Sequence, residues 1–125
     1  MLNHGHKQLI YLAKALMRQN KIIIFEESEE SPSTDKLILT KLMTNCKGST
    51  VIVFSRNPQS VIEMDRVLVL KDGSGIEYDH PFKLLANDES DIKITGTGRF
   101  AKLVEKAGKP ESEEMFEVAK QKCLK

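Results

Sequence analysis

The amino-acid sequence predicts an α/β fold with a mainly parallel sheet. Two short apolar runs, residues 22–25 and Thr50–Phe54, are rich in β-branched side chains and indicate strands that are buried on both faces. A stretch with helical spacing of apolar residues, 35–45, lies between them. Two strands joined by one helix form a parallel β-α-β unit, for which a right-handed crossover is expected. A second amphipathic stretch, 8–18, precedes the first strand by a short connection, which is typical of α/β domains.

Shorter elements are expected in the second half of the chain. They are, in order, a strand at 66–71, a tight turn at 72–75, a returning strand at 76–78, a small helix that begins near Pro81, a polar loop at 87–98 and a short helix at 100–107. A charged terminal helix follows at 113–124, with Ser112 as its candidate N-cap. Its apolar face is thin, so we expect this helix to be solvated and to dock weakly.

Composition excludes several classes of protein. The chain has 125 residues, enough for one domain or part of one, and its 19 basic and 18 acidic residues give a formal net charge of +1. This balance gives no electrostatic reason to expect nucleic-acid binding. No run approaches the roughly 20 apolar residues that span a bilayer, so we expect no direct membrane insertion by this segment. Residues 1–7 lack the apolar core of a signal peptide, and Cys46 and Cys123 suggest free thiols in a reducing compartment.

Two acidic residues, Glu26 and Glu27, follow the first predicted strand directly. Parallel sheets place their chemistry at the carboxyl ends of strands, so this pair indicates either a metal-nucleotide site or a general base. The alternative is a solvated acidic loop after a buried strand. Ser55 and Arg56 end the second strand, and parallel pairing would bring all four residues to one edge of the sheet.

The first helix begins with a polar, glycine-containing turn. Asn3 is a candidate N-cap, and Gly5 allows the backbone to approach another group closely. Free N–H groups at such a helix start can hold an anion, although most helix starts bind only water. His4 and His6 are read as incidental, because a single His-x-His without further ligands rarely binds a metal.

In this order and spacing, the features resemble the C-terminal half of an ATP-binding-cassette (ABC) nucleotide-binding domain of subfamily C, the multidrug resistance-associated proteins. Residues 2–8, Leu-Asn-His-Gly-His-Lys-Gln, stand where the family has its signature Leu-Ser-Gly-Gly-Gln-Arg-Gln. Residues 21–27 fall on the Walker B strand without a gap, and residues 100–108 match the subfamily C tail. The resemblance covers residues 1–109 and leaves 110–125 as a charged helical tail. It implies a partial P-loop NTPase-type domain, three-layered with a mainly parallel sheet.

The resemblance implies roles for matching positions. Glu27 falls on the general base that orients the attacking water, and Arg56 falls on the switch histidine, so these two are the candidate catalytic residues. Glu26 falls on the Walker B aspartate, next to Mg²⁺. Asn3, Gly5 and Gln8 match signature positions, which contact ATP held by the opposite nucleotide-binding domain.

Several positions depart from the family pattern. Glu26 replaces an aspartate and is one methylene longer, while Arg56 cannot act as a neutral imidazole. In the signature, Asn3 replaces the serine, and His4 and His6 replace the first glycine and the glutamine. Either Ser31 or Ser33 occupies the position of the D-loop aspartate. The phosphate-binding pattern Gly-x-x-x-x-Gly-Lys-[Ser/Thr] does not occur in this sequence.

The resemblance implies a parent exporter in which ATP binding and hydrolysis, with Mg²⁺, drive transmembrane efflux. The expected partners are the other nucleotide-binding domain and the transmembrane domains, at the cytoplasmic face of a membrane. A free fragment would be cytoplasmic and inactive alone. Two alternatives remain: a stand-alone, degenerate, non-catalytic remnant or interaction module, and an unrelated α/β response or hydrolase domain. The last lacks support from a Gly-x-Ser-x-Gly elbow.

Overall fold

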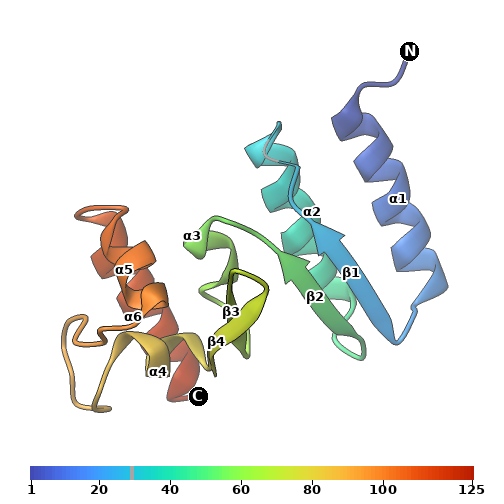
Figure 1. The fold of residues 1–125 in the computed structure, drawn as a ribbon. Coiled ribbons are helices and arrows are strands. Elements are labelled where there is room, and N and C mark those ends of the chain that lie inside the picture. Colours follow the sequence, from blue (N-terminus) through green and yellow to red (C-terminus); the bar gives the residue numbers. More distant parts are fainter. Residues whose placement is uncertain (29) are drawn as a thin grey trace. The chain divides into compact units, whose positions relative to one another are not determined.

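The computed structural model describes residues 1–28 and 30–125 (Figure 1). The elements are α1 (His4–Arg18), β1 (Ile22–Glu26), α2 (Pro32–Asn45), β2 (Thr50–Phe54), α3 (Pro58–Val61), β3 (Val67–Lys71), β4 (Ser74–Asp79), α4 (Pro81–Leu85), α5 (Arg99–Glu105) and α6 (Glu111–Cys123). They fall into two compact units, Met1–Arg56 and Asn57–Lys125. We call them the N-terminal unit and the C-terminal unit.

The α/β class is confirmed, but the strands form two pairs rather than one mainly parallel sheet. In the N-terminal unit, β1 and β2 are parallel, with Ile22 opposite Thr50 and Glu26 opposite Phe54. In the C-terminal unit, β3 and β4 are antiparallel. The third predicted strand therefore pairs with the strand that follows it. The reason is local, because Asp72 and Gly73 both have positive φ and close a two-residue hairpin turn.

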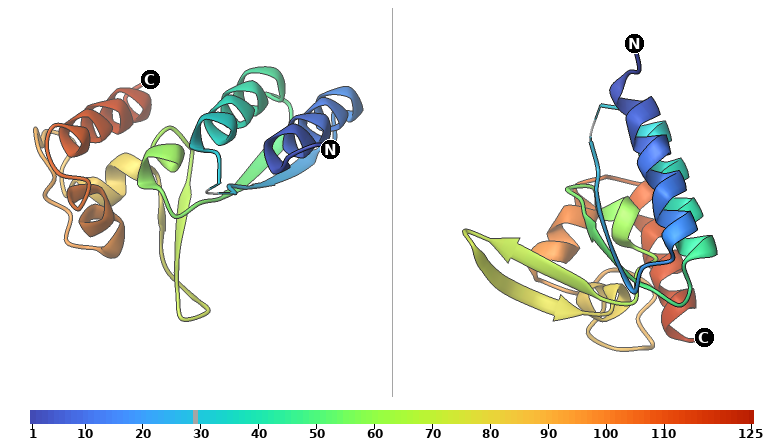
Figure 2. Two further views of the ribbon diagram at one scale, coloured as in Figure 1. Left: turned by 90° about the horizontal axis from the view of Figure 1, so that it is seen from above. Right: turned by 90° about the vertical axis from the view of Figure 1, so that its right-hand side faces the viewer.

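The core of the N-terminal unit lies between its two helices and one face of its sheet (Figure 2). Ile23 of β1 is buried together with residues of α2 and the turn after it, and α1 contributes partly buried leucines. The members of this core are Ile23, Ile38, Leu42 and Cys46, with Leu12, Leu16, Phe25 and Val51 packed against them. Because side chains alternate along a strand, only every second residue of β1 takes part.

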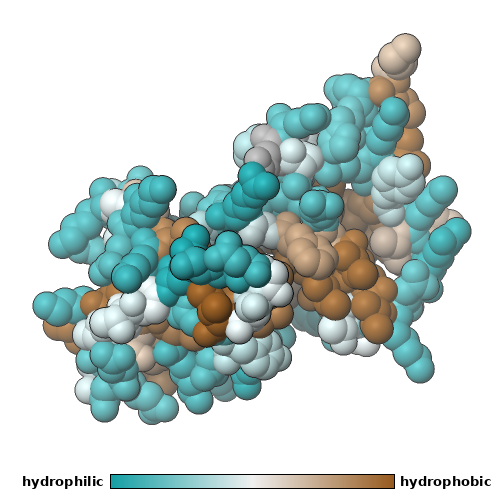
Figure 3. Space-filling view, in the orientation of Figure 1, coloured by the Kyte–Doolittle hydropathy of each residue, from teal (hydrophilic) through white to brown (hydrophobic). Residues whose placement is uncertain are grey.

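The other face of β1 and β2 is apolar and exposed. Alternation places Ile22 and Ile24 on this face, and their exposed fractions are 61% and 66%. Ile52 and Phe54 of β2 lie beside them, and Figure 3 shows the brown apolar surface over these strands. The prediction that both strands are buried on both faces is therefore wrong for the described residues. Burial on both faces needs a layer on each side, and α1 and α2 of this unit lie on the same side.

The starts of α2 and α6 are among the helix boundaries that differ from the prediction. α2 begins at Pro32, three residues before the expected start, because proline is well suited to the first turn of a helix. α6 begins at Glu111 after Pro110, so Ser112 is not its N-cap but a buried residue within its first turn. The weak docking expected for α6 is also wrong: Met115 and Phe116 are buried in the core of the C-terminal unit.

That core is built from the hairpin, the three helices that follow it, and Ile62 at the end of α3. The Phe82 and Phe116 rings pack at 5.6 Å between their centroids. The Lys120 ammonium group lies 5.9 Å from the Phe82 centroid and donates a hydrogen bond of 2.6 Å to the Asp91 carbonyl oxygen. This cation therefore ties α6 to the polar loop before α5.

Within the described residues, no helix is both long and apolar enough to cross a membrane.

Both α4 and α5 begin at caps supplied by polar side chains. His80 precedes α4, and its Nδ1 accepts a hydrogen bond of 3.1 Å from the Phe82 N–H. Gly98 precedes α5 and has no side chain to offer, so the Glu77 carboxylate of β4 accepts the Phe100 N–H at 3.1 Å instead.

The Gly98 cap predicts that Gly98→Ala destabilises the C-terminal unit by about 2 kcal/mol. The added Cβ would overlap the Glu77 carboxylate, and moving the carboxylate would release the Phe100 N–H. Chemical denaturation measures the loss. Gly48→Ala is the matched control, because nothing lies within 4 Å of a Cβ added there. Equal stability of the two variants would contradict the cap.

The His80 cap predicts that the C-terminal unit loses stability in acid. Burial, reinforced by the positive charge of Arg66, lowers the pKa of His80 below its ordinary value. The folded state therefore binds fewer protons than the unfolded state. The contribution of the cap is complete above a pH of about 6.5 and is lost as the pH falls through the lowered pKa.

Urea denaturation between pH 7.5 and 5 measures this dependence. His80→Asn keeps a capping acceptor that does not titrate, so its stability should depend less on pH than that of the wild type. Parallel profiles for the two proteins would show that His80 is not responsible.

Candidate functional site

The candidate site is the edge of the N-terminal unit at which both parallel strands end. The right-handed β1-α2-β2 connection brings the carboxyl ends of β1 and β2 together at this edge (Figure 1). The chain enters α2 at the same edge, and α1 also begins there, since a Cβ added at Gly5 would lie 3.5 Å from Thr34 Oγ1. Strand ends and helix starts therefore meet in one place.

Glu27 is held at this edge by two contacts with the end of β2. Its N–H donates a hydrogen bond of 3.1 Å to the Phe54 carbonyl oxygen, which extends the parallel ladder by one residue. The Ser55 hydroxyl donates a hydrogen bond to Glu27 Oε2. The predicted proximity of Glu27 and Ser55 is confirmed. Arg56 follows directly and has an exposed side chain.

Asp35 fixes the other side of the same loop, a contact that was not predicted from the sequence. This carboxylate is 3% exposed, lies in the first turn of α2, and accepts a hydrogen bond of 3.2 Å from the Ser28 N–H. The Ser28 hydroxyl reaches the same carboxylate. Two features of the sequence could have indicated this contact: a serine just after a strand, and an acid in the first turn of the next helix. Together they anchor the residue after Glu27.

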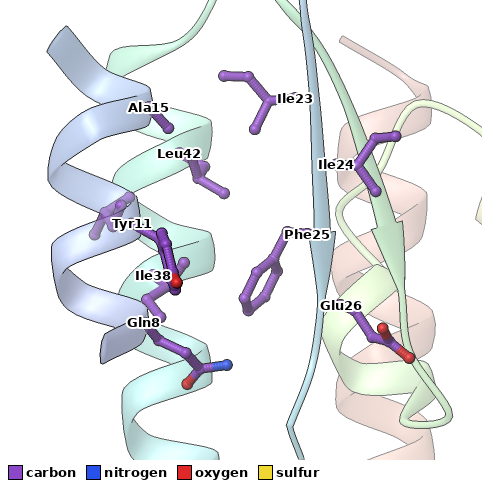
Figure 4. Close-up of a pocket in the computed structure, with 10 residues that line it drawn as sticks. Gln8, Tyr11, Ala15, Ile23, Ile24, Phe25, Glu26, Ile38 and Leu42 are labelled. Carbon is purple, nitrogen blue, oxygen red and sulfur yellow. The ribbon is translucent and has the colours of Figure 1, made fainter. Parts of the chain in front are cut away.

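Glu26 does not converge with Glu27. It is opposite Phe54 in the register and is exposed on the uncovered apolar face, on the side of Ile24 (Figure 4). Within residues 1–28 and 30–125, no group of three or more His, Cys, Asp or Glu side chains is placed to hold a metal ion. Mg²⁺ in nucleotide sites binds one or two carboxylates, waters and phosphates. Glu26 can supply one such carboxylate.

The start of α1 is capped as predicted. Asn3 Oδ1 accepts a hydrogen bond of 2.9 Å from the His6 N–H, so this side chain is occupied by the helix itself. Helical geometry directs the N–H groups of His4 and Gly5 outward at this end. A Cβ at Gly5 would meet Asn3 Oδ1 and Thr34 Oγ1 at 3.5 Å, which is ordinary contact. Packing within the chain therefore does not require glycine at this position.

Gln8 lies on α1 one turn after Gly5. Its side chain enters a cleft of about 280 Å³ between α1 and β1, where Phe25, Leu12 and Ile38 form apolar walls (Figure 4). Gln8 Oε1 is buried and has no hydrogen-bond partner among the residues that the structure describes. The site thus has Glu27 and Ser55 in contact, Asn3 and Gly5 at the neighbouring helix start, Gln8 one turn further along α1 in the cleft, and Glu26 on the uncovered face.

Comparison with known proteins places this chain in a family. No family model matches it. It is 36% identical to ATP-binding cassette sub-family C member 4 of Homo sapiens over 123 residues, which are 97% of this chain and 9% of that protein. It is 38% identical over 91 residues to the ATP-dependent bile acid permease of Saccharomyces cerevisiae, covering 71% of this chain and 6% of that protein. This chain belongs to subfamily C of the ABC proteins. As a divergent segment, it spans less than a tenth of the length of these two relatives.

Membership in subfamily C excludes the alternative of an unrelated response or hydrolase domain. It also supports comparing Glu26, Glu27, Arg56 and the start of α1 with the matching positions of the family. The roles of these residues stay predictions. The buried Asp35 of this subfamily C chain, by contrast, is assigned by its contacts alone.

These contacts predict that Asp35→Ala destabilises the N-terminal unit by about 1–3 kcal/mol, because the Ser28 N–H and hydroxyl lose a buried acceptor. Urea denaturation measures the change. Lys36→Ala, at an exposed neighbouring position of α2, is the control and should change stability by less than about 0.5 kcal/mol. Equal effects of the two substitutions would show that the carboxylate does not anchor the loop.

Proposed function

We propose that this chain forms the C-terminal part of a nucleotide-binding domain in a subfamily C ABC exporter, in which ATP binding and hydrolysis drive transmembrane efflux. The observation that carries the proposal is the open apolar face of β1 and β2, which ends in Glu26. Parallel strands are normally covered on both faces. In our proposal, the part of the domain with the phosphate-binding loop supplies the second cover and completes a three-layered P-loop NTPase-type fold.

In this function Glu27 is the general base. Its carboxylate sits at the end of a parallel strand, where Ser55 takes Oε2 and leaves the lone pairs of Oε1 for a water molecule. A base must lie within hydrogen-bond reach of the proton it accepts, so a fixed carboxylate is an advantage. Arg56 brings a permanent positive charge to the same edge and would attract the negative charge of a phosphoryl group.

The start of α1 would face nucleotide held by the other nucleotide-binding domain. Asn3 shapes this helix start, and the outward N–H groups near Gly5 can donate to phosphate oxygens. Gln8 lies behind them in the cleft and would support the helix. Glu26 would supply a carboxylate for Mg²⁺, which would help to neutralise the phosphate charge. MgATP, when bound, supplies the phosphoryl group for transfer to water.

The proposed partners are the second nucleotide-binding domain and the transmembrane domains, at the cytoplasmic face of a membrane. In this arrangement residues 1–109 belong to the nucleotide-binding domain and residues 110–125 form its helical tail. The isolated chain would be inactive, because the sequence contains no Gly-x-x-x-x-Gly-Lys-[Ser/Thr] pattern for the phosphates.

Reconstitution tests the proposal. Isothermal titration of the isolated chain with MgATP should give no binding tighter than about 1 mM. Mixing the chain with a segment of a subfamily C relative that carries the phosphate-binding loop should give a complex that hydrolyses MgATP. Glu27→Gln should lower kcat of this complex by at least about 100-fold, because it removes the base.

Two controls sharpen this test. Glu30→Gln changes an exposed acid of the same loop and should leave kcat unchanged. Ile24→Lys should block complex formation without unfolding the chain, because Ile24 is on the open face. Micromolar MgATP binding by the isolated chain would contradict the proposal. A stable complex without turnover dependent on Glu27 would instead favour the non-catalytic interaction module.

A further inference from the structure

Ser55 contacts Glu27, and the family resemblance assigns no role to Ser55. Its half-buried hydroxyl lies at the end of β2 and donates a hydrogen bond to Glu27 Oε2. The backbone at the same point is already fixed, because the Glu27 N–H donates to the Phe54 carbonyl oxygen at 3.1 Å. One strand end therefore holds both the main chain and the side chain of Glu27.

We propose that Ser55 is the positioning residue for the Glu27 carboxylate, the part that the switch position plays elsewhere in the family. This inference rests on the proposed function, in which Glu27 is the base. A serine hydroxyl donates a single hydrogen, so it occupies Oε2 and leaves Oε1 able to accept from water.

Arg56 is less suited to this role, although it occupies the matching position. Its guanidinium is always charged and donates only, so it cannot alternate between donor and acceptor as an imidazole can. Its side chain is exposed, whereas Ser55 is half-buried against Glu27. In this proposal Ser55, the residue just before Arg56, positions the Glu27 carboxylate.

The surrounding loop makes the Ser55 contact decisive. Asp35 accepts hydrogen bonds from the N–H and hydroxyl of Ser28, so the backbone just after Glu27 is anchored to α2. With the main chain fixed on both sides, what remains free at Glu27 is rotation of its own side chain. The Ser55 hydroxyl selects one of these rotamers.

Nuclear magnetic resonance of the full chain tests this assignment directly. Side-chain couplings of Glu27 should indicate one dominant rotamer in the wild type and rotamer averaging in Ser55→Ala. Ser55→Thr keeps the hydroxyl and should restore the single rotamer. The slow exchange of the Glu27 amide proton should persist in all three proteins, because its acceptor is the Phe54 carbonyl oxygen.

Ser49→Ala is the matched control. The Ser49 hydroxyl donates to the Asn20 carbonyl oxygen near the opposite ends of the same strands, so its removal deletes a comparable bond far from Glu27. It should leave the Glu27 rotamer unchanged. Equal rotamer populations in the wild type and Ser55→Ala, or averaging in Ser49→Ala as well, would overturn the assignment.

Kinetics of the reconstituted complex separates this inference from the proposed function. Ser55→Ala should lower kcat about tenfold with an unchanged KM for MgATP, and Ser55→Thr should restore it. If Glu27→Gln lowers turnover but Ser55→Ala does not, the positioning role is overturned and the proposed function stands. If Glu27→Gln has no effect, the proposed function fails, while the rotamer measurement still decides whether Ser55 orders Glu27.

Discussion

Parallel pairing of β1 and β2 is the constraint on which the N-terminal unit depends. Parallel neighbours require a crossover, and α2 supplies it. The crossover brings both strand ends and the start of α2 to one edge, and packing of α1 on the same face adds a second helix start. Glu27 and Ser55 meet there because of this topology, although they are 28 positions apart along the chain, and Asp35 of α2 anchors the next residue, Ser28.

The same pairing leaves one face of the two strands uncovered. Both helices cover one face, so four large apolar side chains stay exposed on the other: Ile22, Ile24, Ile52 and Phe54. Full burial of such a side chain contributes about 1.5–3 kcal/mol, and together these residues provide a strong driving force for a further layer. A subfamily C segment that spans less than a tenth of its relatives' length fits this incomplete sandwich.

The candidate site and the core of the N-terminal unit differ in their chemistry. Glu27, Ser55 and Arg56 give the edge charged and polar groups, whereas the core holds the aliphatic side chains of Ile23, Ile38 and Leu42. Asp35 is a polar exception among the buried residues of α2, and it anchors Ser28. The departures predicted from the family resemblance, at Glu26 and Arg56, therefore concern exposed groups and not this packing.

Local chemistry in the sequence predicted the elements, the cap at Asn3, the Asp72-Gly73 turn, and the meeting of Glu27 with Ser55, because propensity, capping and strand direction act over short distances. Two features depended on long-range packing: the exposure of one strand face and the burial of α6. The loop anchor at Asp35 joins residues only seven positions apart and was not predicted, although the local sequence carried its signals. An apolar run reveals that a strand can be buried on both faces, and only the tertiary structure decides how many layers cover it.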